Sequence, residues 1–228
     1  MAKAGATFAA SKRQRTIAFG KSIRERVDSA TWAYLLLALL AIAAVSISLV
    51  SLPGMIGVLA AALALTMLAI AAIDCRSFII PDWLNAFAGA LAMVYAAVQQ
   101  PEARLDAVAT ATLRGLVIAL AFFGVRAGYA RLRSRQGLGM GDVKLAFVAG
   151  AWLDWIMVPL AIQLAAFAAL SVYVLRQVVL GETFSAVSRV PFGLFFAPAI
   201  WFCLVLEARW LALSCTCRTK PRASRTKS

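Results

Sequence analysis

The sequence predicts an all-α fold, a polytopic bundle of about seven transmembrane helices, with six as the alternative number. Of the 228 residues, 63% are hydrophobic, and the mean hydropathy of +0.85 is far above that of a soluble domain. Six long apolar stretches follow one another along the chain, and one of them is double length. Both observations indicate an integral membrane protein with several crossings.

The first four apolar stretches each have the length of one membrane crossing. They cover residues 32–52, 55–73, 83–98 and 107–129. Pro53 and Gly54 end the first stretch, and Asp74 closes the second. The third stretch is short, but Trp83 and Tyr95, near its two ends, are potential interface anchors. We therefore expect one helix from each stretch.

The fifth apolar stretch, residues 143–180, is too long for one crossing. At ~1.5 Å per residue it would reach nearly twice the ~30 Å thickness of a hydrocarbon core. Asp154 and Pro159 lie near its middle, so we expect a turn there and a helix on each side. Residues 191–213 form the last stretch. The expected organisation is a basic tail (1–29), a transmembrane domain (30–213) and a second basic tail (214–228).

The net charge of +13 is distributed in a way that argues against nucleic-acid binding. The basic residues gather in the two tails and in an expected loop at residues 126–135, beside apolar segments. Such clusters orient a protein in the lipid bilayer or contact anionic headgroups. A cytoplasmic N-terminal tail places Asp74, the 126–135 loop and Asp142 on the cytoplasmic side. Seven crossings would put the C-terminal tail outside, and six would put it inside.

The absence of histidine excludes several kinds of catalytic chemistry. Ser-His and Cys-His nucleophile pairs and HExxH metal hydrolysis all need that side chain. The four cysteines contain no CxxC pair, so no zinc site is expected, and no other metal or cofactor is indicated. Any catalysis must therefore come from the 10 acidic residues, from a lysine, or from a cysteine without its usual base.

Asp74 and Asp142 are the candidate catalytic residues. Each lies at the end of a membrane-length apolar segment, where an ionisable group is costly and is a functional-site hypothesis. Two carboxylates sharing a dry site cannot both ionise easily, so one keeps its proton and an acid–base pair results. For either residue alone, a helix-boundary role is the simpler interpretation: Asp74 as a C-terminal boundary charge, Asp142 as an N-cap.

Five further residues are candidates for substrate binding or for support of the loops that carry the aspartates. Gly139 and Gly141, in the glycine-rich turn before Asp142, would let the backbone approach a substrate or a neighbouring helix. Pro81 ends any helix that continues from Asp74. Asp82 is expected to cap the third helix. Lys144 either lowers the pKa of a nearby acid or extends toward the membrane interface.

Taken together, these motifs resemble the type IV prepilin peptidases, bacterial aspartic peptidases with a GxGD motif. The matching segments are Ile73-Asp74, Ile80-Pro81-Asp82-Trp83-Leu84-Asn85, Gly139-Met140-Gly141-Asp142-Val143-Lys144-Leu145, Gly150-Ala151-Trp152-Leu153 and Val190-Pro191-Phe192-Gly193. The resemblance spans roughly residues 55–212. It implies that Asp74 and Asp142 are the catalytic pair.

The resemblance also implies a substrate class and a location. Members of this family cleave the basic leader from prepilins and pseudopilins, before an apolar stem, at the cytoplasmic face of the bacterial inner membrane. Larger members also methylate the new N-terminus with a CxxC-containing cytoplasmic insert. This chain contains no such insert and resembles the short, peptidase-only form of tight-adherence pilus systems. The sequence does not specify an oligomeric state.

Two alternative functions are compatible with the same residues. A presenilin-like or signal-peptide-peptidase-like protease shares the glycine-aspartate turn, but the Ile-Pro-Asp segment and the short chain argue against it. A small ion-coupled transporter would use the two aspartates as a relay, although the sequence contains no inverted repeat. Cleavage of a peptide by the purified protein would separate the enzymes from the transporter.

Overall fold

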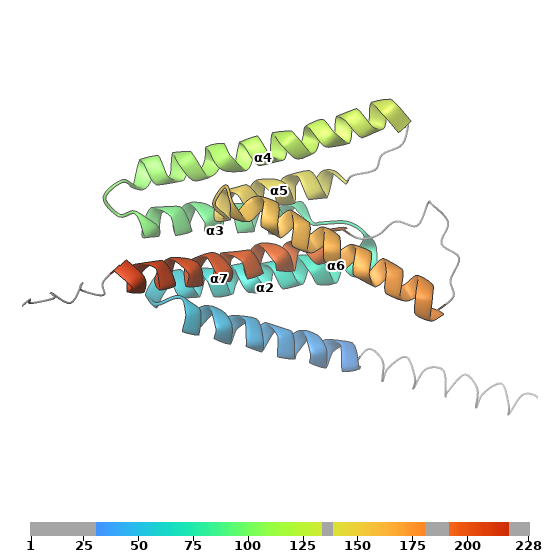
Figure 1. The fold of residues 1–228 in the computed structure, drawn as a ribbon, viewed down its shortest axis with the longest axis horizontal. Coiled ribbons are helices and arrows are strands. Elements are labelled where there is room, and N and C mark those ends of the chain that lie inside the picture. The colour runs from blue at the N-terminus through green and yellow to red at the C-terminus, as the bar shows by residue number, and fades with distance from the viewer. Residues whose placement is uncertain (1–30, 134–138, 181–191, 219–228) are drawn as a thin grey trace, which may run out of the picture. The chain divides into compact units, whose positions relative to one another are not determined.

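The computed structural model describes residues 31–133, 139–180 and 192–218, and within these ranges the chain forms seven α-helices. The first helix is Thr31–Ser51. The other six, labelled in Figure 1, are α2 (Gly54–Ser77), α3 (Asp82–Gln99), α4 (Arg104–Arg133), α5 (Met140–Trp152), α6 (Met157–Leu180) and α7 (Phe192–Arg218). The chain divides into two compact units, residues 1–43 and 44–228, and the interactions described below lie within the second.

The all-α prediction is confirmed, and the chain is a multi-pass membrane protein. The helix Thr31–Ser51, α2, α4, α6 and α7 are long and apolar enough to cross a membrane. The helix α5 is different, because its 13 residues extend only ~20 Å, less than the ~30 Å of a hydrocarbon core. Large apolar side chains such as Leu120, Phe123 and Phe167 are exposed, as expected of surfaces in contact with lipid.

Several predicted helix ends need correction. The helix α2 continues past Asp74 to Ser77 and ends at Phe78, which has left-handed backbone dihedral angles. The expected loop at residues 126–135 is helical as far as Arg133, because α4 runs longer than its apolar stretch. The long fifth stretch does break near Asp154, but Pro159 belongs to the first turn of α6, where proline is tolerated. The predicted C-terminal tail is helical up to Arg218.

The short helix α5 occupies the centre of the 44–228 unit. It packs against α3, α4 and α7, and most of its residues are buried. Its last residue, Trp152, is almost completely buried and donates an indole N–H to the carbonyl oxygen of Ala88 on α3 at 2.9 Å. The ring of Tyr95 lies 4.6 Å from that of Trp152. These contacts fix α5, and hence Asp142 at its other end, relative to α3.

Glycines allow α4 and α5 to approach each other closely. A Cβ atom on Gly115 would lie 2.8 Å from the carbonyl oxygen of Phe147, and one on Gly150 would lie 2.9 Å from the carbonyl oxygen of Arg114. Because both obstacles are backbone atoms, a side chain at either position would push the helices apart. Small residues at such crossings are typical of membrane helix packing.

We expect Gly115→Ala to destabilise the protein by ~1–3 kcal/mol, the usual cost of an overpacked contact. Gly124→Ala on the same helix is the matched control, because a Cβ atom there meets nothing within 4 Å. Thermal unfolding of both variants in detergent, followed by circular dichroism, measures the difference. Equal melting temperatures for the two variants would show that the α4–α5 crossing tolerates a side chain at residue 115.

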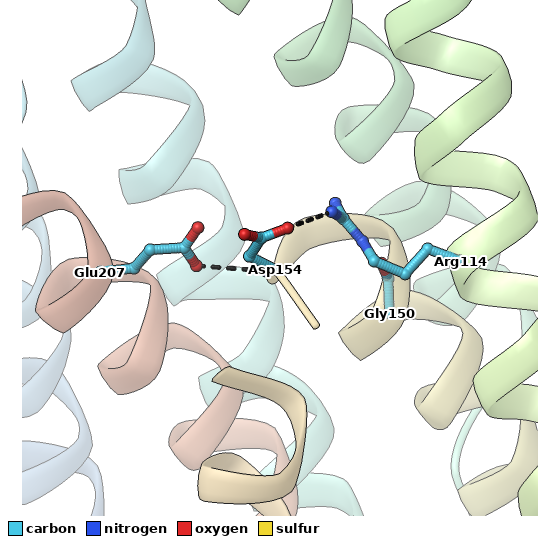
Figure 2. Close-up of polar contacts among 4 residues, drawn as sticks. All are labelled: Arg114, Gly150, Asp154 and Glu207. Atoms are coloured by element: carbon cyan, nitrogen blue, oxygen red, sulfur yellow. Dashed lines mark hydrogen bonds and ion pairs between the residues drawn. The ribbon is translucent and has the colours of Figure 1, made fainter. Parts of the chain in front are cut away.

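A polar cluster ties α4, α5 and α7 together at the end of α5 opposite to Asp142 (Figure 2). Arg114 donates from its Nε atom to the carbonyl oxygen of Gly150 at 2.6 Å and forms an ion pair of 2.8 Å with Asp154. The backbone N–H of Asp154 donates to a carboxylate oxygen of Glu207 at 3.3 Å. Arg114 thus satisfies one of the carbonyl groups that the C-terminus of α5 leaves open, and the cluster holds the α5–α6 turn in place.

Candidate functional site

Asp74 and Asp142 lie at the same end of the 44–228 unit, although they are far apart in the chain. Asp74 is in the last turn of α2, and Asp142 is in the first turn of α5. Figure 1 shows that the α2–α3 connection and the beginning of α5 share this end of the bundle. The contacts described below link the two residues through the beginning of α7.

The Asp74 carboxylate is held by the first turn of α7. Its side chain is buried, and its Oδ2 atom accepts a hydrogen bond from the backbone N–H of Leu194 at 2.9 Å. The beginning of a helix has unpaired N–H groups that favour a negative charge. A Cβ atom on Gly193 would lie only 2.8 Å from the same carboxylate oxygen, so the missing side chain makes this contact possible.

The Asp142 carboxylate is held by its own glycine-rich turn. Its Oδ2 atom accepts a hydrogen bond from the backbone N–H of Gly139 at 3.2 Å, and Gly139 is the N-cap of α5. Asp142 therefore does cap the helix end, but from its first turn and not from the N-cap position. A Cβ atom on Gly139 would lie 3.2 Å from this carboxylate. Gly137, which precedes Gly139 by two residues in the sequence, lies outside the described residues.

The pKa of Asp142, which lies outside the five long membrane-spanning helices, is raised to about 6. Burial of the carboxyl group is the main cause, and the nearby negative charge of Asp74 raises the pKa further. The hydrogen bond from Gly139 acts in the opposite direction.

The side chain of Ile80 packs against Gly141 at the beginning of α5 and against Gly193 at the beginning of α7. It is buried, and Cβ atoms on Gly141 and Gly193 would lie 3.0 Å and 2.8 Å from its atoms. Gly141 therefore packs closely against Ile80, which belongs to the α2–α3 connection and not to a neighbouring helix. Neither Ile80 nor Gly193 was among the candidate site residues, although both occur in the motifs. Only the folded chain brings them together.

Asp82 does not cap α3, which corrects the expectation from the sequence. The N-cap residue is Pro81, and the Asp82 side chain makes no capping hydrogen bond. Asp82 instead forms an ion pair of 2.6 Å with Lys144, which links the first turn of α3 to the first turn of α5. Both side chains are substantially exposed, so this pair contributes little to stability. The pair places the Lys144 ammonium group, two residues beyond Asp142, beside the Asp82 carboxylate.

A groove that was not predicted from the sequence begins beside this ion pair. It has a volume of about 600 Å³ and runs between α3, α4 and α5. We call it the Asn85 groove, and its lining residues are Asp82, Asn85, Ala86, Gly89, Ala90, Met93, Thr112, Lys144 and Phe147. Asn85 itself is buried.

Comparison with known proteins identifies relatives for the segment that carries both aspartates. The model of the type IV leader peptidase family matches residues 61–174, half of the chain. Leader peptidase HopD of Escherichia coli is 37% identical over 103 residues, which are 45% of this chain and 63% of the relative. Leader peptidase HopD of Salmonella typhimurium is 36% identical over 81 residues, 36% of this chain and 49% of the relative.

The chain thus spans only about half to two thirds of the length of these curated relatives. No solved structure is significantly similar to it.

Proposed function

The chain belongs to the type IV leader peptidase family, and we propose that it is a membrane-embedded aspartic endopeptidase. Its proposed substrates are prepilin-like precursors, which carry a basic leader followed by an apolar stem. The proposed location is the inner membrane of a bacterium, with the aspartates on the cytoplasmic side. No cofactor or metal takes part in the proposed reaction.

One arrangement carries this proposal: two carboxyl groups from different helices, buried at Asp74 and half-buried at Asp142, lie at one end of the bundle, and a backbone N–H group holds each of them. In the proposed mechanism, the ionised aspartate removes a proton from a water molecule, which attacks the peptide carbonyl carbon. The protonated aspartate donates a hydrogen bond to the carbonyl oxygen, and when the C–N bond then breaks, the leaving amine nitrogen receives the proton that the other aspartate took from water. Asp74 and Asp142 are the proposed catalytic residues, with Gly139, Gly141, Pro81, Asp82 and Lys144 supporting the loops.

This mechanism predicts a dependence on pH through Asp142. Below its pKa of about 6 the carboxyl group keeps its proton, and above that value it loses the proton. A pair that works with one shared proton loses that proton as the pH rises. We therefore expect kcat/KM to fall as the pH is raised through about 6, which assays between about pH 5 and 8 would detect. A kcat/KM that rises across this range would contradict the mechanism.

Cleavage of a precursor by the purified protein tests the function itself. The full chain in proteoliposomes is mixed with a precursor that has a basic leader, a glycine and an apolar stem, and mass spectrometry identifies the products. The proposal predicts one cut between leader and stem, made without added metal or cofactor. Ion flux without cleavage would favour a transporter, and cuts only inside the apolar stem would favour a presenilin-like protease.

A further inference from the structure

Asn85 has an unusual environment for a buried amide. Its side-chain nitrogen and oxygen are both shielded from solvent, and neither has a hydrogen-bond partner among the described residues. A buried polar group without a partner costs ~1–3 kcal/mol, so each such group needs an explanation. Thr112, the other neutral polar side chain of the groove, is satisfied by the carbonyl oxygen of Val108 at 2.7 Å. Asn85 is therefore the group whose hydrogen bonds are missing.

We propose that the Asn85 groove binds the first residues of the substrate's apolar stem as an unwound peptide, and that the Asn85 side chain, which lines the groove, turns its amide toward the peptide and hydrogen-bonds one of the peptide units. The proposal rests on the proposed peptidase function and adds a substrate-binding site to it. A carboxamide has both a donor and an acceptor, which match the C=O and N–H groups of a peptide backbone. A lipid acyl chain has neither group, so it would leave Asn85 unsatisfied.

The position of the groove agrees with this occupant. Asp82 and Lys144 line it at the beginnings of α3 and α5, and Lys144 lies two residues from Asp142. Along α3 it extends from Asp82 to Met93, about 16 Å at ~1.5 Å per residue. An extended peptide rises ~3.3 Å per residue, so about five stem residues would fit. A peptide that enters past the aspartates would therefore leave its next residues in the groove.

The chemistry of the groove suits the stem rather than the leader. Ala86, Ala90, Met93 and Phe147 form apolar walls that match an apolar segment. A peptide bond must be exposed to be cut, so a helical stem has to unwind near the cleavage point. Unwinding frees backbone N–H and C=O groups, which are costly to leave unpaired at membrane depth. Asn85 would replace the hydrogen bonds that one peptide unit loses.

Asn85→Leu tests the hydrogen bond, because leucine has a similar size but no polar atoms. We expect kcat/KM for precursor cleavage to fall about tenfold, whereas the melting temperature stays the same or rises, since an unpaired buried amide is removed. A series of substrates, each with a different stem amide replaced by an ester, locates the peptide unit that Asn85 binds. The wild-type protein should cleave the substrate with the ester at that position more slowly than the all-amide substrate. The same ester should have no further effect on Asn85→Leu.

Filling the groove tests its occupancy. Ala90→Trp should lower kcat/KM by at least about tenfold, because the indole ring takes the place of the stem. Val94→Trp is the matched control, since Val94 is exposed on α3 but does not line the groove, and it should cleave like the wild type. The proposal would be overturned if Ala90→Trp kept the wild-type kcat/KM and Asn85→Leu still cleaved every ester substrate more slowly than the all-amide substrate. That result would indicate that lipid fills the groove.

A binding measurement separates this inference from the proposed function. The Asp142→Asn protein is mixed with a precursor that carries a photoreactive residue within the first five stem positions, and crosslinked peptides are mapped by mass spectrometry. Crosslinks to Met93 or Phe147 support the groove even if cleavage is never detected. Crosslinks only to lipid, together with normal cleavage by the wild type, refute the groove and leave the peptidase function intact.

Discussion

Replacing Asp142 by asparagine is expected to reduce precursor cleavage by about 10³-fold or more, because asparagine cannot hold or transfer the proton that the carboxyl group handles. Asp74→Asn should have an effect of the same size. Asparagine has nearly the same shape and still accepts a hydrogen bond, so the contacts to Gly139 and Leu194 can persist. Cleavage rates in proteoliposomes, compared at equal amounts of folded protein, measure both effects.

Asp82→Asn is the control for these two variants. It removes a third carboxylate near the site, but this group is exposed and pairs with Lys144 at 2.6 Å. We expect its effect to be much smaller, within about tenfold, because an exposed ion pair is worth at most ~1 kcal/mol. If Asp82→Asn were as inactive as Asp142→Asn, the catalytic pair would have to be assigned differently.

Gly193→Ala is expected to reduce cleavage by about 10²-fold, the typical effect of moving a catalytic group by ~1 Å. A methyl group at this position would lie 2.8 Å from the carboxylate of Asp74 and 2.8 Å from Ile80. The carboxylate must then move, and its hydrogen bond to the N–H of Leu194 is strained or lost. The kcat/KM of the purified variant measures the result.

Gly128→Ala is the matched control for Gly193→Ala, because a Cβ atom at residue 128 meets nothing within 4 Å. It should cleave at the wild-type rate. Wild-type cleavage by Gly193→Ala would mean that the position of the Asp74 carboxylate does not matter for the reaction, which would argue against Asp74 as a catalytic residue.

The helices could be predicted from the sequence because membrane insertion imposes a long apolar segment on each crossing. Even the division of residues 143–180 followed from length and from Asp154. The ends were less certain, because charged residues can continue a helix beyond the membrane. For this reason α4 extends to Arg133 and α2 extends to Ser77, beyond the ends of their apolar stretches.

The candidate pair was also accessible from the sequence, because two acidic residues at the ends of apolar segments are unusual. The surroundings of the pair were not. Leu194 contributes a backbone N–H, which no side-chain pattern reveals, and Ile80 reads as an ordinary apolar residue. Asn85 acquires its importance only because its buried amide has no hydrogen-bond partner within the described part of the chain. Such features depend on tertiary contacts between α2, α3, α5 and α7.

The rate of the double variant Asp74→Asn/Asp142→Asn, compared with both single variants, tests most directly whether the two aspartates act as one catalytic unit. Residues that act together are strongly non-additive, so the double variant should cleave no more slowly than either single variant. The account predicts the same low residual rate for all three. A double variant whose loss equals the product of the two single losses would contradict it, as would substantial cleavage by Asp142→Asn alone.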